Sequence, residues 1–227
     1  RALDHGFTYF DTAASYGDGL SETHVGEVFA ELRPEVALGT KFMLGADDLG
    51  DIAGGVRRSL EASLGRLGMP SVELLQLHNP VISQRDGRGL SVENVLGSGG
   101  VADALDALRS EGLIRHFGLT GLGETAALHA VIDSGRFDTI QAYLNMLNPS
   151  GLEPVPSDFA TQDYERLIER AAAQDMGVIV IRVMAGGALA GPDSRDGVAA
   201  PSVGGALSVG HDYDSDVRRV KALRRAL

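Results

Sequence analysis

Four side chains that can carry a proton or hold a charge stand at the ends of short apolar runs or, for one of them, five residues after such an end. They are Asp11, Tyr16, Lys41 and His78. Lys41 lies between Thr40 and Phe42, and an ammonium group buried in such a run needs an anion beside it. Asp11 ends a separate apolar run and can supply that anion. We therefore expect a buried lysine–aspartate pair at the centre of a site.

Together the four groups would make a proton donor suited to a carbonyl group. A tyrosine side chain is a weak acid, with a pKa of about 10 in water, and a close ammonium group stabilises its phenolate form. Lys41 would act in this way on Tyr16. His78 would hydrogen-bond the carbonyl oxygen, where negative charge develops during reduction. No side chain donates a hydride, so the reaction also requires a cofactor that does.

Short apolar runs alternate with amphipathic segments along the chain. Six runs predict buried strands, at positions 7–11, 36–42, 72–78, 114–120, 139–144 and 178–183. Helical spacing is expected after an N-cap at Ser21, over 52–67 and 101–108, around 129–132 and 167–168, and over 217–227. This alternation favours parallel strands joined by right-handed crossovers, which is an α/β fold.

Two α/β architectures fit this pattern, a closed (β/α)8 barrel and an open, doubly wound sheet. The chain offers about six strand–helix units, fewer than the ~8 of a barrel. Its last residues, 217–227, lie in a helical pattern with no strand after them, so the count leaves both architectures open. In a barrel, the carboxyl ends of the strands meet at one mouth, which would bring the four side chains together.

Two long polar stretches follow predicted strands, at 149–162 and 186–216. Loops of that length in a compact domain are usually functional or disordered. We expect the stretch 186–216, which is rich in Gly, Pro, Ser and Asp, to be a long loop, with a flexible surface excursion as the alternative to a pocket wall.

The sequence FDTAASYG at 10–17, followed by Ser21-Glu22 and Gly26, resembles the signature of the aldo-keto reductase family around its catalytic aspartate and tyrosine. Thr40-Lys41 is similar to the family's lysine strand, and LHNP at 77–80 to its histidine motif. The resemblance covers nearly the whole chain, through 177–189. It implies one TIM-barrel domain over 1–227 and a catalytic tetrad, with a tyrosine as general acid/base. The tetrad would be Asp11, Tyr16, Lys41 and His78.

The resemblance also implies that the cofactor is NADP or NAD. It places Gln141 beside the nicotinamide carboxamide. Thr120-Gly121 stands where the family usually has Ser-Asn, so Thr120 would keep one of two hydrogen bonds. Arg182 stands where many members have a tyrosine that stacks on the nicotinamide. These departures look more like the branch of galactose and aldose dehydrogenases than like the aldose reductases.

The function implied is an NAD(P)-dependent oxidoreductase that interconverts an aldehyde, ketone or sugar lactol and its alcohol or oxidised form. The alternative from another class is a catalytically silent, cofactor-sensing or regulatory subunit on the same barrel, which would bind cofactor without turning over a carbonyl. A hydrolase is disfavoured, because the chain has no cysteine and no serine in an elbow motif.

The glycine motif G-x-G-x-x-A at 121–126 follows a predicted strand and opens a predicted helix, as a dinucleotide fingerprint would. That fingerprint also requires an acidic residue ~20 residues further on to hold the ribose. The segment 141–145 has none. A tight strand-to-helix turn is therefore the better interpretation of these glycines.

Composition and residue spacing argue against several classes of binding partner. The net charge of -11 disfavours binding to phosphate backbones, the six histidines show no metal-ligand spacing, and the apolar runs are too short to cross a bilayer. We expect a small-molecule carbonyl or sugar substrate, no metal, no nucleic-acid or membrane partner, and a cytoplasmic location. Members of the family carry a first strand before the part that matches residue 1 and a last strand near residue 227. We therefore expect this chain to be a fragment with exposed strand edges, with a chain that has lost NAD(P) binding as the alternative.

Overall fold

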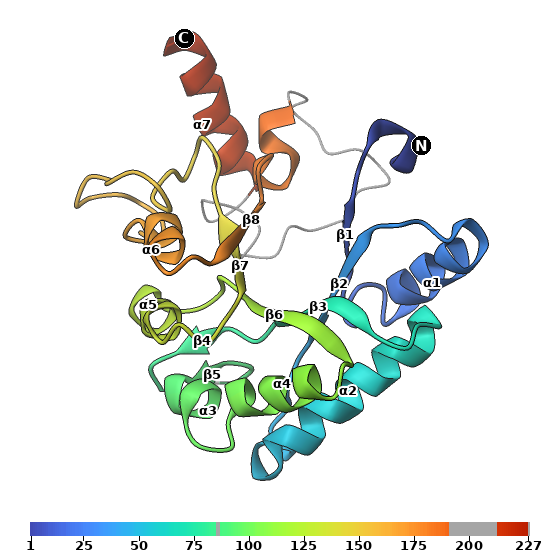
Figure 1. The fold of residues 1–227 in the computed structure, drawn as a ribbon. Helices are drawn as coiled ribbons and strands as arrows, with labels where there is room; N and C mark the ends of the chain where they lie inside the picture. The colour runs from blue at the N-terminus through green and yellow to red at the C-terminus, as the bar shows by residue number, and fades with distance from the viewer. Residues whose placement is uncertain (85–86, 191–212, 227) are drawn as a thin grey trace.

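Six parallel strands form the main sheet of this protein (Figure 1). The computed structural model describes residues 1–84, 87–190 and 213–226. In spatial order the strands are β1 (Tyr9–Asp11), β2 (Ala37–Phe42), β3 (Val72–Leu77), β6 (Ile114–Thr120), β7 (Thr139–Tyr143) and β8 (Gly177–Ile181). All six predicted strands are present, with ends that shift by at most two residues, but the expected burial is wrong for β1 and β8, which contain no buried residue at the edges of the sheet. Shifts of two residues occur at the start of β1 and at the end of β8, where Arg182 adopts a left-handed φ of 62° that an extended strand does not allow.

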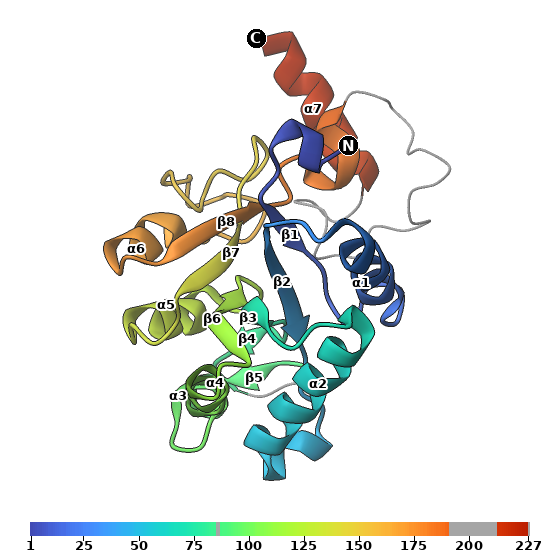
Figure 2. The same ribbon diagram turned by 45° about the vertical axis from the view of Figure 1, so that its right-hand side comes forward.

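Five helices follow one another around one side of the sheet (Figure 2). They are α1 (Leu20–Leu32), α2 (Ile52–Leu67), α4 (Val101–Ser110), α5 (Thr125–Asp133) and α6 (Leu167–Ala173). The shorter elements are η1 (Leu3–His5), η2 (Asp47–Gly50), β4 (Val81–Ile82), β5 (Leu90–Ser91), α3 (Val92–Leu96) and η3 (Ala185–Ala190). The described chain ends with α7 (Tyr213–Ala226), and none of its helices is both long and apolar enough to cross a membrane.

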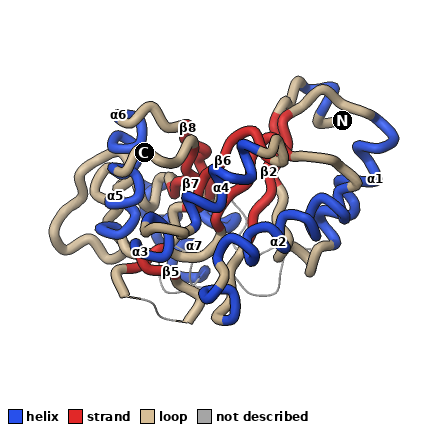
Figure 3. The backbone as a smooth tube through the Cα atoms, turned by 60° about the horizontal axis from the view of Figure 1, so that its bottom comes forward, coloured by secondary structure: helices blue, strands red, loops and turns tan. Residues whose placement is uncertain are grey.

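The sheet is a curled half-barrel, which confirms the expected incomplete (β/α)8 fold. Its strand order runs along the chain without the reversal that defines a doubly wound sheet. The five main helices lie on its outer side, with α2 and α4 in contact with each other (Figure 3). Among the described residues, β1 and β8 each pair with only one strand, so they form the two edges of the sheet.

The two faces of the sheet differ in chemistry because neighbouring residues of a strand point to opposite sides. The outer face carries Leu38, Leu75, Phe117 and Ile140, all fully buried in one hydrophobic core under the helices. The inner face carries polar residues, and Lys41, Gln76 and Gln141 each donate a hydrogen bond to Asp11 there. Burial of apolar side chains under the helices therefore stabilises the outer face of the sheet. The polar inner face is available for a functional site.

Two expectations about element ends need correction or completion. The predicted N-cap at Ser21 is wrong: α1 begins at Leu20 after Gly19, and the Ser21 hydroxyl instead bonds the Thr12 hydroxyl at 2.8 Å. Of the stretch 186–216, residues up to Ala190 lie in η3 and residues from Tyr213 onward lie in α7. Residues 191–212 lie outside the described residues, so the long loop expected there stays a prediction.

The glycine motif at 121–126 has a packing explanation. Gly123 has a φ of 123°, and a Cβ there would collide with the backbone of Val81 in β4. Glu124, which follows it, accepts hydrogen bonds from the backbone and hydroxyl of Ser83. The glycine therefore allows the close approach of β4.

The contact between α1 and α2 generates a stability prediction. A Cβ at the buried Gly26 would stand 2.5 Å from the carbonyl oxygen of Leu67, so Gly26→Ala forces the helices apart and costs about 2 kcal/mol of the free energy of unfolding. Gly65 lies inside α2 with no heavy atom within 4 Å of its Cβ position. Gly65→Ala is the matched control and stabilises by about 0.5–1 kcal/mol through helix propensity. Urea unfolding of both variants tests this, and equal effects would contradict it.

Candidate active site

A buried ion pair lies at the centre of the inner face. The ammonium group of Lys41 in β2 contacts Oδ2 of Asp11 at the end of β1, and donates to the carbonyl oxygen of Thr12 at 2.7 Å. Lys41 is only 1% exposed. The pair predicted from the sequence is therefore present. The parallel register contributes to it, because Asp11 pairs with Gly39 and Lys41 lies two residues further along β2 on the same face.

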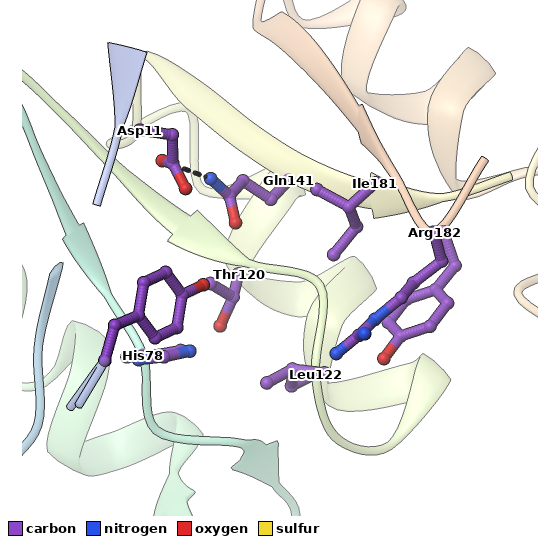
Figure 4. Close-up of a pocket in the computed structure, with 9 residues that line it drawn as sticks. Asp11, His78, Thr120, Leu122, Gln141, Ile181 and Arg182 are labelled. Atoms are coloured by element: carbon purple, nitrogen blue, oxygen red, sulfur yellow. Dashed lines mark hydrogen bonds between the residues drawn. The ribbon is translucent and has the colours of Figure 1, made fainter. Parts of the chain in front are cut away.

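The other carboxylate oxygen of Asp11 accepts three uncharged donors. They are the hydroxyl of Tyr9 at 3.1 Å, the amide of Gln76 at 3.1 Å and the amide of Gln141 at 2.7 Å. The hydrogen bond from Gln141 joins β7 to β1 across the curl of the sheet (Figure 4). Asp11 is thus held from three other strands as well as from within its own.

Sequence reasoning missed Tyr9 and Gln76. Tyr9 precedes Asp11 by two residues and so shares its face of β1, and Gln76 is a polar residue in the apolar run of β3. Both signals were readable. Burial, together with the adjacent Asp11 carboxylate, raises the pKa of Tyr9 far above its ordinary value, so its hydroxyl stays a donor. Gln76 is fully buried, and its side-chain oxygen has no partner among the described residues.

Tyr16 lies over this pair on a tight turn after β1. Its ring centroid is 4.8 Å from the Lys41 ammonium and 6.0 Å from the His78 ring, which stands nearly perpendicular to it. The turn requires left-handed backbone at three successive residues, 17–19, two of which are glycines. Tyr16 remains 42% exposed, so its hydroxyl end is accessible to a ligand.

His78 follows directly after β3 and is half-buried beside Tyr16. Burial is the main reason that its pKa falls from 6.5 to about 4, and the positive charges of Lys41 and Arg182 lower it further, against the opposing effect of Asp11. The imidazole is therefore neutral near pH 7 and carries one N–H. Its Nδ1 lies 3.4 Å from the Ser15 hydroxyl.

A cavity of about 480 Å³ opens above these groups. Six of the seven site residues predicted from the sequence line it, and Lys41 lies beneath Asp11. The lining comprises Asp11, Tyr16, His78, Thr120, Leu122, Gln141, Tyr143, Ile181 and Arg182 (Figure 4). The described residues include no cluster of three or more histidine or acidic side chains that would hold a metal ion.

The far wall of the cavity offers amide, hydroxyl and guanidinium groups. The Thr120 hydroxyl donates to the carbonyl oxygen of Leu77 at 3.1 Å, so it is left free to accept a hydrogen bond. Gln141 uses its amide nitrogen on Asp11 and keeps its oxygen as an acceptor. The guanidinium of Arg182 lies 5.9 Å from the ring centroid of Tyr143.

A second buried network, also missed from the sequence, anchors the turn that carries Tyr16. Glu22 in the first turn of α1 is fully buried. Its carboxylate accepts from the hydroxyl of Thr40, the neighbour of Lys41, and from Nε of Arg66 in α2 at 2.7 Å. The bond between Thr12 and Ser21 closes the same turn from the other side. The turn that carries Tyr16 is thus held by hydrogen bonds on both of its sides.

Comparisons with known proteins identify a matching family and similar structures. The model of the family described as "Aldo/keto reductase family" matches residues 1–203. D-threo-aldose 1-dehydrogenase of a Pseudomonas species is 28% identical over 69% of this chain and 53% of its own length. A putative voltage-gated potassium channel subunit beta of Schizosaccharomyces pombe is 39% identical over 35% of this chain and 26% of its own.

Among solved structures, an aldo-keto reductase from Klebsiella pneumoniae in complex with NADPH is similar, with a TM-score of 0.60 and 25% identity. The match covers 82% of this chain and 56% of that protein. The matched part of this chain thus spans from about a quarter to just over half the length of these relatives.

The Glu22 network generates a stability prediction. Glu22→Ala leaves the guanidinium of Arg66 and the hydroxyl of Thr40 without their acceptor, and we expect a loss of about 3 kcal/mol in the free energy of unfolding. Glu27→Ala, at an exposed position of the same helix, is the control and changes stability by less than about 0.5 kcal/mol. Chemical denaturation measures both. Similar small losses in the two variants would show that the buried network contributes nothing.

The low pKa of His78 generates a pH prediction. Because the folded state holds the neutral imidazole down to about pH 4, the unfolded chain takes up a proton first as the pH falls below 6.5. The resulting stabilisation is complete above pH 6.5 and is lost as the pH falls toward 4. Between pH 7 and 5 we expect the unmodified protein to lose about 1 kcal/mol more than His78→Gln, allowing for partial solvent exposure. An NMR titration midpoint of His78 near 6.5 would contradict this.

Proposed function

Because this chain belongs to the aldo/keto reductase family, we propose that it is an NAD(P)-dependent oxidoreductase that interconverts an aldehyde, ketone or sugar lactol and its alcohol or oxidised form. One observation carries the proposal: Tyr16 and His78 face one cavity above the buried Lys41–Asp11 pair. That arrangement is a proton donor placed where a carbonyl oxygen can reach it.

The cavity fits the nicotinamide end of such a cofactor. The amide nitrogen of a carboxamide needs hydrogen-bond acceptors, and the nicotinamide ring needs an apolar surface. The oxygen of Gln141 and the hydroxyl of Thr120 are available as acceptors, and Leu122 and Ile181 supply apolar surface. We propose that Gln141 and Thr120 hold the carboxamide and that Arg182 lies against the ring. The NADPH complex of the Klebsiella pneumoniae relative supports a cofactor of this class.

The residues of the chain divide the proton chemistry between them. The cofactor, when bound, donates or accepts the hydride. Tyr16 gives a proton to the substrate oxygen during reduction and takes it back during oxidation. The Lys41 ammonium stabilises the phenolate that Tyr16 passes through, and Asp11 fixes the position of Lys41. The neutral His78 imidazole donates a hydrogen bond to the same oxygen as charge develops on it.

The substrate class and the domain organisation belong to the same proposal. The similarity to D-threo-aldose 1-dehydrogenase supports a sugar or sugar lactol as substrate. We also propose one barrel domain for residues 1–227, on the basis of one hydrophobic cluster that extends from Leu38 in β2 to Met176 just before β8. The elements η3 and α7 pack together in a smaller cluster of their own. The similarity to a putative potassium channel subunit beta supports the second candidate, a regulatory subunit that binds cofactor and is catalytically silent.

Replacement of one oxygen atom tests the function. In the full-length protein, Tyr16→Phe should lower kcat/KM at least about 100-fold, because the proton donor is lost while the ring and the cavity remain. Cofactor affinity should stay the same. The measurement is the absorbance of reduced nicotinamide with a panel of aldoses, sugar lactols and simple aldehydes.

Tyr164→Phe is the control, since Tyr164 stacks behind Tyr143 and lies outside the cavity lining. It should keep the activity of the unmodified protein. Cofactor binding without turnover of any carbonyl would favour the regulatory subunit, and absence of cofactor binding would refute both candidates.

A further inference from the structure

The charges of the cavity do not cancel. The carboxylate of Asp11 is balanced by the ammonium of Lys41, and the imidazole of His78 is neutral near pH 7. Arg182 remains, and within the described part of the chain no acidic side chain lies within ion-pair distance of its guanidinium. The described wall of the cavity therefore carries one net positive charge.

The backbone of Arg182 is fixed, so this charge has a defined place. Its carbonyl oxygen accepts from the amide of Asn145 at 3.1 Å and from the backbone N–H of Ala185 at 2.8 Å. These bonds hold the left-handed φ of 62°, which costs a residue other than glycine about 1 kcal/mol. The side chain extends over Tyr143 into the cavity, across from His78 (Figure 4). Its effect on the His78 pKa is a second sign that the two groups face each other.

A fixed cation in a nicotinamide pocket distinguishes the two redox forms of the ring. The oxidised ring carries a positive charge and the reduced ring carries none. We propose that Arg182 makes this cavity bind the reduced cofactor more tightly than the oxidised one, and so poises the bound enzyme toward oxidation of its substrate. This inference rests on the proposed function, because it requires a nicotinamide ring in the cavity.

The direction follows from the balance of charge. In oxidation, the C–H bond of the alcohol or lactol carbon breaks and its hydride passes to the oxidised nicotinamide. The hydroxyl proton passes to the oxygen of Tyr16 as the C=O bond forms. The ring loses its positive charge in this step, which relieves its repulsion from Arg182. The overall equilibrium in solution is unchanged, since a catalyst shifts only the equilibrium between bound species.

The expected effect is measurable in binding alone. Repulsion between two unit charges in contact weakens binding about fivefold at the dielectric constant of bulk water, and much more at a lower dielectric constant. The cavity is open to solvent, so we expect the ratio of the two dissociation constants, oxidised over reduced, to fall about five- to tenfold in Arg182→Met. Arg182→Lys keeps the charge and should keep most of the ratio.

Fluorescence titration of the full-length protein with the oxidised and the reduced forms of both NAD and NADP tests the inference. Arg115→Met is the matched control: it removes the same charge at an exposed position at the amino end of β6, away from the cavity. It should leave the ratio unchanged. Circular dichroism confirms that each variant is folded.

The outcomes separate the inference from the function on which it rests. A ratio that falls in Arg182→Met, but not in Arg182→Lys or Arg115→Met, supports the inference. An unchanged ratio in Arg182→Met, with both forms still bound, overturns it and leaves the oxidoreductase standing. An equal fall in the lysine or the control variant overturns it as well, because the local charge is then not the cause. Failure of the unmodified protein to bind either form refutes the proposed function itself.

Discussion

The buried ammonium of Lys41 is the constraint on which the rest of the site depends. A charge that is removed from water requires a partner of opposite sign in direct contact. That partner is Asp11, on an edge strand that pairs with β2 alone among the described residues. Asp11 is in turn held by Gln76 from β3 and by Gln141 from β7. The bond from Gln141 crosses the inner side of the sheet, so one polar cluster links an edge strand to the strand beside the opposite edge.

The elements were predictable from the sequence because local chemistry determines them. The strands of the main sheet are short apolar runs and its five main helices follow amphipathic segments, so periodicity located them, although the edge strands β1 and β8 contain no buried residue. The short elements β4, β5 and α3 were not predicted. The proposed tetrad of Asp11, Tyr16, Lys41 and His78 was predictable because three of its members stand at or next to strand ends, which a barrel brings together. The inward alternation also pointed to Tyr9, which shares a face of β1 with Asp11, but this signal carries weight only after the strand is known to line a cavity.

The features that were missed depend on partners far apart in the chain. Glu22 is buried because Thr40 and Arg66 meet its carboxylate, and no local pattern places those three residues together. The prediction of Ser21 as the N-cap was wrong for the same reason. The Ser21 hydroxyl forms a hydrogen bond with the hydroxyl of Thr12, and Gly19 is the N-cap residue of α1. β8 ends early because Arg182 has a left-handed backbone, which a hydrogen bond from Asn145 stabilises. The apolar run in the sequence gives no sign of this conformation.

The position of the cavity gives the curl of the sheet a chemical role. Asp11 and Tyr16 come from the β1 edge, and Ile181 and Arg182 come from the β8 edge, so the wall with the proposed proton donor and the wall with the guanidinium belong to opposite ends of the sheet. Five parallel ladders between them set their separation. The hydrogen bond from Gln141 to Asp11 is a direct tie across that gap. In the proposed function, Gln141 would hold the cofactor by its oxygen while its nitrogen holds Asp11, and this would couple the place of hydride transfer to the place of proton transfer.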